Sequence, residues 1–391
     1  MSTVKYFHNQ LPGAPAMTGQ AGSGIAVLDA CLVNGFGLKT LDTLAVSGGI
    51  ATGTVSTGHS FEPDTIAEIV GATPTGLNGQ KRILSVAGNT FTFDATGISN
   101  QTATGTITCR LAPAGWSKPF TGTNVAVYRS NNVAGTRMFL QVTDTNAVTR
   151  NFQMRGFENM LDAVGVGQAA FPSALQVAGA GLFVAKSSTN DAVARNWFLI
   201  ADDRTFYLWT SGGSSNGGTV GFGDFASVKA GDPFACMISA PTSDLITNTN
   251  PSAIDLSYSH STAPGSIYAP RSFSGIGTSA SLLQRAESYW NTNGWSGNTN
   301  NSLANYPNQA DNALLLNRLL VIEPGIPTLR GTQRGLLHSP QICQGFFNHR
   351  DKIDGRGAYA GRKLIFLSSN GAYANGVKTA GLFFDITGPW D

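Results

Sequence analysis

The segment NWFLIADDRTFYLWTS, residues 196–211, is the most strongly patterned part of the chain. Two runs of large apolar side chains, 197–201 and 206–209, flank a polar reversal at 202–204. Aromatic and β-branched residues favour strands and adjacent aspartates favour tight turns, so the segment predicts a β-hairpin. Both alternating faces carry large side chains, whereas a hairpin with one solvent-exposed face has polar residues at every second position. We therefore expect burial on both faces, in a sandwich or against another subunit.

The composition favours assembly and disfavours nucleic acid. The chain has 391 residues, enough for one large core or two to three ordinary ones. Only 12% of the residues are charged, against a usual share of about 25%. A weakly charged surface costs less to bury, so copies of the chain itself or neighbouring proteins are expected partners. The net charge of +2 gives no field that would attract nucleic acid, and nucleic acid is not an expected partner.

No motif predicts a metal or another cofactor. The string AGSG at 21–24 is neither preceded by a strand nor followed by Lys-Ser/Thr, so it does not predict a phosphate-binding loop. Disulfides stay open, but metal-ligand spacing is absent, and isolated cysteines are most often small buried apolar residues. These cysteines are Cys31, Cys109, Cys236 and Cys343.

The beginning of the sequence carries no apolar core of signal-peptide length, and no run of 18 apolar residues occurs. We therefore expect a protein made in the cytoplasm without a signal peptide. We also expect no membrane-spanning segment.

The first segment, residues 1–23, is rich in Gly, Pro, Ala and Gln and shows little periodicity. It predicts an extended N-terminal arm that is either disordered or ordered by a neighbouring chain. Four apolar side chains would anchor the arm on another chain and are the predicted partner contacts: Tyr6, Phe7, Leu11 and Met17.

The rest of the chain predicts a mainly β protein with few short helices. Residues 24–33 have apolar side chains at helical spacing, and a second short helix is expected in SLLQRAESYW, residues 281–290. Short strand-like runs about ten residues apart fill 41–110 and predict an inserted small β-sandwich or barrel module. Residues 24–40 plus 111–391 would then form a main domain like a β-sandwich or jelly roll, closed by strands that end near Trp390.

Catalytic constellations are not evident. No Gly-x-Ser-x-Gly elbow or metalloprotease helix occurs, and the five histidines lie in separate contexts. Glycoside hydrolysis needs two carboxylates at one groove, and four aspartates are formally available. Turn and loop roles explain them better, so we expect no enzyme activity and assign no catalytic, cofactor-binding or metal residues. These aspartates are Asp202, Asp203, Asp224 and Asp255.

Several distinctive strings resemble virion structural proteins of tailed bacteriophages. They include YFHNQLPGAPAMTGQAGSGIAVLDACLVNGFG at 6–37, RMFLQVTDT at 137–145, the run from FVAKSSTND to FYLW at 183–209, FGDFASVKAGD at 222–232 and GLFFDITGPW at 381–390. The resemblance spans nearly the whole chain and implies residence in a virion assembled in the bacterial host cytoplasm. It carries no catalytic or ligand residues.

Three functions remain open. The first is a non-catalytic structural component, in the tail or baseplate, that assembles as a symmetric oligomer with copies of itself and other virion proteins. The second is a capsid decoration protein or head fibre anchor. The third is a receptor- or glycan-binding adhesin, in which exposed aromatics such as Trp290, Trp295 and Tyr306 would stack on a host surface glycan.

The module boundaries predict that residues 41–110, expressed alone, fold as an independent β-domain, because the segment has enough strands and turns to close a small core. Far-UV circular dichroism of the fragment checks this. A random-coil spectrum would count against the boundaries.

Overall fold

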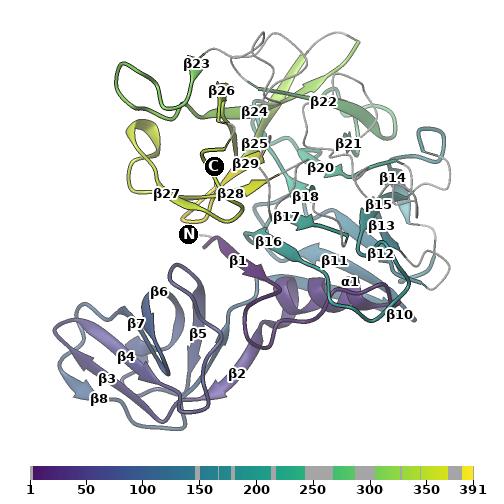
Figure 1. Cartoon of the computed structure of the whole chain (residues 1–391). Coiled ribbons are helices and arrows are strands. Elements are labelled where there is room, and N and C mark those ends of the chain that lie inside the picture. Colours follow the sequence, from purple (N-terminus) through teal and green to yellow (C-terminus); the bar gives the residue numbers. More distant parts are fainter. Residues whose placement is uncertain are drawn as a thin grey trace.

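The computed structural model describes residues 3–145, 150–165, 167–177, 181–212, 217–242, 267–286, 304–325, 328–343, 345–368 and 381–390. These residues form large antiparallel sheets and few short helices, which confirms the prediction of a mainly β, sandwich-like fold (Figure 1). No helix in these ranges has the length and apolar character needed to cross a bilayer.

The largest sheet joins the N-terminal, central and C-terminal parts of the chain. Its strands alternate in direction, and its second half curls back over the first. In spatial order it contains β1 (Lys5–His8), β16 (Trp197–Ala201), β17 (Thr205–Thr210), β18 (Gly218–Asp224), β20 (Cys236–Ser239), β21 (Ile267–Ala269), β22 (Ala280–Ala286), β24 (Asn317–Glu323), β25 (Thr328–His338), β29 (Gly381–Asp385), β28 (Lys363–Ser368) and β27 (Lys352–Asp354), with β19 (Ala226–Ser227) paired to β25.

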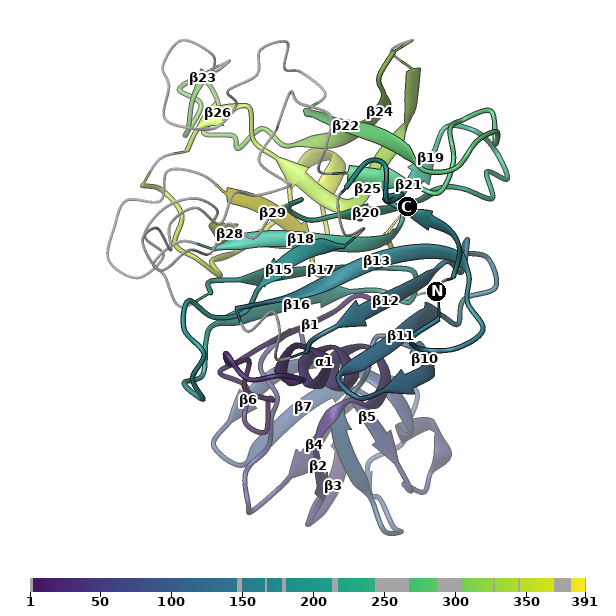
Figure 2. The same cartoon turned by 90° about the vertical axis from the view of Figure 1, so that its right-hand side faces the viewer.

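A six-stranded sheet packs against β16–β18 (Figure 2). It contains β10 (Trp116–Gly122), β11 (Val125–Ser130), β12 (Phe139–Thr143), β13 (Asn151–Asn159) and β14 (Gln168–Phe171), with β15 (Leu182–Ala185) also paired to β13.

An eight-stranded sheet lies at the lower left of Figure 1. It contains β2 (Phe36–Thr40), β9 (Thr108–Leu111), β5 (Ile66–Val70), β6 (Gly79–Ala87), β7 (Thr90–Asp94), β4 (Ile50–Thr54), β3 (Thr43–Ser47) and β8 (Gln101–Thr102). Strand β2 pairs with β9, so the sheet includes residues that the predicted boundaries place in the main domain. A separate parallel pair joins β23 (Ala304–Asn305) and β26 (Gln341–Ile342).

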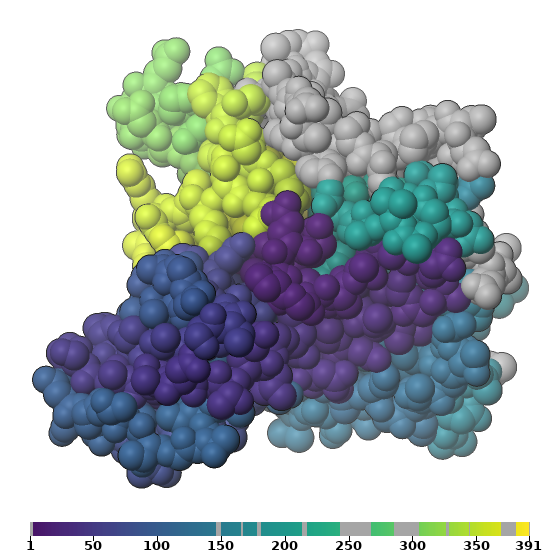
Figure 3. Space-filling view, turned by 60° about the horizontal axis from the view of Figure 1, so that its bottom comes forward, coloured from purple at the N-terminus to yellow at the C-terminus, as the bar shows by residue number. Residues whose placement is uncertain are grey.

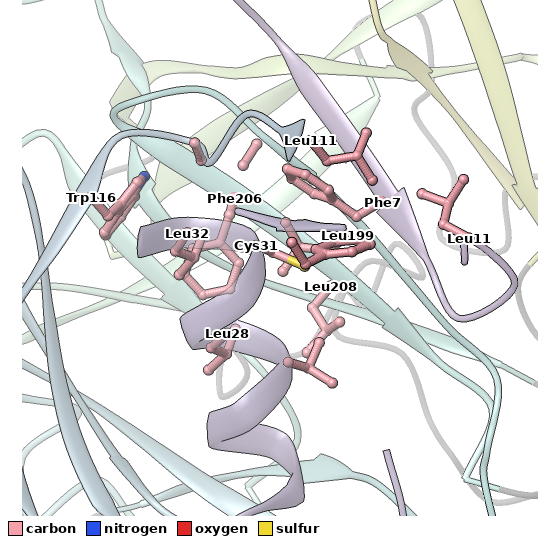
Figure 4. Packing of buried hydrophobic residues seen from close by; sticks show 14 of the residues in the cluster. Phe7, Leu11, Leu28, Cys31, Leu32, Leu111, Trp116, Leu199, Phe206 and Leu208 are labelled. Carbon is pink, nitrogen blue, oxygen red and sulfur yellow. The ribbon is translucent and has the colours of Figure 1, made fainter. Parts of the chain in front are cut away.

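The predicted hairpin is the pair β16–β17, with Ile200 opposite Tyr207. Every residue of both strands is buried, and alternate side chains enter two different cores. Leu199 and Leu208 face the six-stranded sheet and α1 (Figure 4), whereas Ile200 and Trp209 face the C-terminal strands. The expectation of burial on both faces is therefore confirmed, and both layers belong to this chain.

The first predicted helix is confirmed as α1 (Ser23–Leu28), which continues as a π-helix, Asp29–Asn34. Its Leu28, Cys31 and Leu32 side chains are buried in the core that contains β16 and β17 (Figure 4). Gly35 ends it with φ of 69°, where a Cβ would lie 2.3 Å from the backbone oxygen of Leu111. Only glycine fits both the left-handed backbone and this close approach.

The second predicted helix is wrong. Residues 280–286 form strand β22, whose Leu283 lies opposite Ile322 of β24, and residues 287–290 lie outside the described ranges. Leu282 and Gln284 are buried while Ser281 and Leu283 are half-buried, a period of two. Pairing between strands here overrides the weak helical preference of the sequence. Two further short 3₁₀ helices span Thr75–Leu77 and Gly357–Tyr359.

The eight-stranded sheet is docked on both ends of the described chain. Arg82 of β6 donates hydrogen bonds to the backbone oxygens of Ile386 (3.1 Å) and Thr387 (2.9 Å). Lys352 of β27 lies 3.4 Å from the Asp64 carboxylate. Figure 3 shows the N-terminal segment, in dark purple, against both this sheet and the C-terminal strands, in yellow. Whether residues 41–110 fold alone stays a prediction.

Removing the indole of Trp197 should lower the free energy of unfolding by about 3–5 kcal/mol, since the ring is 1% exposed and a cavity would remain. Urea denaturation of Trp197→Ala measures this. Phe273→Ala is the matched control, because Phe273 is 45% exposed and should lose less than about 1 kcal/mol. An unchanged midpoint for Trp197→Ala would contradict the two-sided packing.

Candidate functional site

The structure corrects the account of the N-terminal arm. Tyr6, Phe7, Leu11 and Met17 are each at most 2% exposed within their own chain. Strand β1 pairs with β16, which supplies the hydrogen bonds and the apolar contact that the composition of the segment does not suggest. The prediction that this segment is either disordered or ordered by a neighbouring chain is therefore wrong. A contact of these four residues with a second chain stays a prediction.

The aromatic side chains of Tyr6 and Phe7 each make specific contacts within the chain. The Tyr6 ring stacks on Phe198 at 5.7 Å, and its hydroxyl donates to the Pro63 backbone oxygen at 2.6 Å. The Phe7 ring packs against Phe36 at 5.8 Å. These contacts fix β1 at the edge of the large sheet, where it lies against the eight-stranded sheet.

A cavity of about 410 Å³ lies where the large sheet meets the loop that precedes β12. We call it the Asp224 cavity. Its wall is formed by the 134–136 loop, the β16–β17 turn, the end of β18, the 225–235 segment and Arg334 of β25. The charged side chains in the lining are Arg204, Asp224, Lys229, Asp232 and Arg334.

Asp224 ends β18 and is 6% exposed. Its Oδ1 accepts a hydrogen bond from the Thr136 hydroxyl at 2.6 Å, and the Thr136 backbone N–H lies 3.3 and 3.2 Å from the two carboxylate oxygens. Burial raises the pKa of Asp224, and the Thr136 hydrogen bonds and the charge of Arg204 only partly offset this effect. Asp224 is thus a carboxyl group whose protonated form is favoured by its surroundings.

Gly135 lets the loop approach this carboxyl group closely. A Cβ at position 135 would lie 2.7 Å from Asp224 Oδ2 and 3.0 Å from Arg204 Cδ. Any side chain here would have to displace one of the two groups. Gly135, Asp224 and Arg204 therefore converge on one point of the cavity wall.

Arg204 occupies the turn between β16 and β17. Its backbone N–H donates to Asp202 Oδ1 at 2.9 Å, which fixes the backbone position from which the side chain extends. Within the described ranges its guanidinium makes neither a hydrogen bond nor an ion pair, and Nε is buried without a partner. A cation with unused donors thus lines the cavity beside Asp224.

The second carboxylate of the lining, Asp232, is held differently. Its Oδ2 accepts from Arg330 Nη2 at 3.2 Å and from the Ser227 hydroxyl at 3.0 Å, and its Oδ1 accepts from the Phe234 N–H at 3.0 Å. The other terminal nitrogen of Arg330 donates to Glu323 at 2.8 Å. Asp232 therefore has a cationic partner that Asp224 lacks among its described hydrogen bonds.

Arg334 also lines the cavity, but its guanidinium is bonded to other parts of the protein. Its guanidinium pairs with both oxygens of Asp202, at 2.7 and 3.2 Å, and donates to the Trp390 backbone oxygen at 2.9 Å. Both partners of this ion pair are at most 2% exposed, so breaking it would leave a buried charge uncompensated. It joins the hairpin turn to the last described residues.

The aspartates considered for catalysis have different places. Asp202 caps the hairpin turn through Arg204 N and Thr205 N, and Asp203 accepts from Asn132 Nδ2 at 3.0 Å, so the turn role expected for these two is observed. The loop role expected for Asp224 is wrong, because it ends a buried strand and lines the cavity. Asp255 lies outside the described residues.

Asp232 and the loop of Thr136 were not predicted from the sequence as parts of this site. Gly135 is the signal that was present, since it marks a close backbone approach.

Of the aromatic residues proposed to stack on sugar, Trp290 and Trp295 lie outside the described ranges. Tyr306 is half-buried, 5.1 Å from the Phe347 ring, and lines a second cavity of about 410 Å³ with Tyr359.

Metal binding finds no support in the described residues, which contain no group of three or more His, Cys, Asp or Glu side chains placed to hold an ion. The four cysteines are buried, and none of them forms a disulfide with another described residue. Burial raises the pKa of Cys109 to about 12, so its reactive thiolate form is disfavoured.

Comparison with known proteins gives only weak likeness. No family model matches the chain, and no curated protein matches its sequence. Among solved structures it is similar to a phage phi92 endosialidase, at 12% identity and a TM-score of 0.17. The match covers 90% of this chain and 52% of that chain, so the chain spans about half of that protein's length.

The expectation that the chain is not an enzyme is corrected. One solved structure to which it is similar is, by its name, an endosialidase. The cavity also contains two carboxyl groups, Asp224 and Asp232, with different hydrogen-bond partners. The turn and loop roles assigned to the aspartates therefore do not exclude catalysis.

Replacing Asp224 tests its hydrogen bonds with Thr136 and its raised pKa. Asp224→Ala should lower the free energy of unfolding by about 1–3 kcal/mol, because the Thr136 donors lose their acceptor, while Asp224→Asn keeps one acceptor oxygen and should lose less. Because its pKa is raised, folded Asp224 takes up its proton at a higher pH than the unfolded chain does. Wild type should therefore gain stability relative to Asp224→Asn as the pH falls toward the usual value of 3.8.

Urea denaturation of the three proteins, at about pH 7 and about pH 4.5, measures both effects. An equal difference between wild type and Asp224→Asn at the two pH values would contradict the raised pKa.

Proposed function

We propose that this chain is a tail or baseplate component of a tailed-bacteriophage virion that assembles as a symmetric oligomer with copies of itself and other virion proteins. The observation that carries the proposal is the sequence resemblance to virion structural proteins over nearly the whole chain. A capsid decoration protein or head fibre anchor is the alternative within the same class.

The surface supports assembly. Only 12% of the residues are charged, so a subunit contact would desolvate few charges. Leu161 and Val164, on the loop between β13 and β14, are 82% and 73% exposed. Apolar side chains displayed in this way are suited to contact a neighbouring subunit.

A second candidate is a host-glycan-binding adhesin, with or without glycan cleavage. The specific observation that favours it is the Asp224 cavity, because its volume lies within the range of small-molecule sites and its charged groups can hydrogen-bond sugar hydroxyls. Cleavage would require Asp224 and Asp232 to share the acid and base roles of a glycosidase. A glycan array with a reducing-sugar assay separates binding from cleavage.

Gold labelling of phage particles tests the position. A peptide tag between Gly48 and Gly49, in the turn of the β3–β4 hairpin, should be tolerated, because nothing lies within 4 Å of a Cβ at Gly48. Electron micrographs of tagged virions should show gold on the tail, with untagged virions as the control. Gold on the head would favour the decoration alternative, and absence of the protein from purified virions would contradict both.

A further inference from the structure

The Asp224 cavity contains one arginine, Arg204, whose guanidinium takes no part in holding the described part of the fold together. The Arg204 guanidinium lines the cavity, and within the described ranges its donors have no acceptor. The turn that carries Arg204 is fixed by Asp202, which accepts from the N–H groups of Arg204 and Thr205. The backbone at Arg204 is therefore held in place, and the guanidinium is available to donate hydrogen bonds to a ligand.

The other cations of the lining are engaged within the protein. Arg334 is paired with Asp202, and the Lys229 ammonium donates to the Phe273 backbone oxygen at 3.1 Å. Asp232 is paired with Arg330, which is 2% exposed. Among the charged side chains of the lining, Arg204 and Asp224 thus lie next to each other with no ion-pair hydrogen bond to a described residue, and Arg204 is the one cation whose guanidinium has no hydrogen-bond acceptor there.

Asp224 is a poor permanent partner for Arg204. Its Oδ1 is taken by the Thr136 hydroxyl, and burial favours its protonated form. A protonated carboxyl donates a hydrogen bond to a ligand oxygen, and an ionised one accepts from a hydroxyl. Either state suits a hydroxylated ligand that carries its own negative charge toward Arg204.

We propose that the Asp224 cavity binds an acidic sugar, a monosaccharide unit with a carboxylate, and that Arg204 pairs with this carboxylate. A guanidinium presents two parallel donors that match the two carboxylate oxygens. The cavity volume of about 410 Å³ accommodates a sugar ring, and Asp224 and Ser227 are placed in the lining to contact its hydroxyls. The inference does not depend on where in a virion the chain sits.

The same geometry disfavours a phosphate group. A phosphate monoester carries close to two negative charges at neutral pH, and here it would lie beside the two carboxyl groups of the lining. A carboxylate carries a single charge and needs only one guanidinium. Monosaccharide probes that differ in charge therefore distinguish the two chemistries.

Isothermal titration calorimetry on the full chain tests the proposal with three probes: methyl β-glucuronide, its neutral counterpart methyl β-glucoside, and glucose 6-phosphate. Wild type should bind the glucuronide with a Kd about tenfold or more below that for the glucoside, the size expected for a charge-assisted hydrogen bond. This selectivity requires no variant and stands even where a substitution impairs folding.

Arg204→Gln should remove the selectivity, and Arg204→Lys should retain only part of it, because an ammonium cannot form the two parallel bonds. Arg110→Gln is the control, since Arg110 pairs with Glu68 in the eight-stranded sheet and should leave binding unchanged. Equal affinity for glucuronide and glucoside, no glucuronide binding, tighter binding of the phosphate, or full selectivity in a folded Arg204→Gln protein would each overturn the proposal.

Discussion

Burial of the β16–β17 hairpin on both faces is the constraint on which the rest of the structure depends. Alternate side chains of the two strands enter two cores that are separate clusters, so each layer has its own set of partners. The six-stranded sheet and α1 cover one face, and the C-terminal strands cover the other. Either face left open would expose large aromatic side chains, such as Trp197 on one side and Trp209 on the other. The curl of the large sheet follows from this requirement.

Much of this architecture is visible in local sequence patterns. The hairpin, the helix near Leu28 and the mainly β class follow from periodicity and turn residues, which act within a few positions along the chain. The N-terminal arm was mispredicted because its order comes from a strand distant in sequence. β22 was mispredicted because its pairing with β21 and β24 overrides the helical preference of its residues. β1 acquires its structure from β16, almost two hundred positions later, and no local composition records that pairing. Phe7 is buried for the same reason.

The candidate site was less predictable than the fold. Arg204 and Asp224 stand twenty positions apart, and their proximity depends on how β17 and β18 pair and on where the Thr136 loop lies. A turn residue and a strand end have ordinary structural explanations when read singly. Only the cavity shows that one guanidinium retains unused donors while its neighbours are paired. Position in space, and not residue type, distinguishes it.

The docking of the eight-stranded sheet on both ends of the described chain bears on the order of events during synthesis. β1 leaves the ribosome early, but its partner β16 and the Ile386 and Thr387 oxygens held by Arg82 emerge much later. The helix-bearing face of the hairpin can close first, while its opposite face waits for β28 and β29. A nascent chain stalled before residue 363 therefore displays an open apolar face, a form that chaperones and proteases distinguish from the finished subunit.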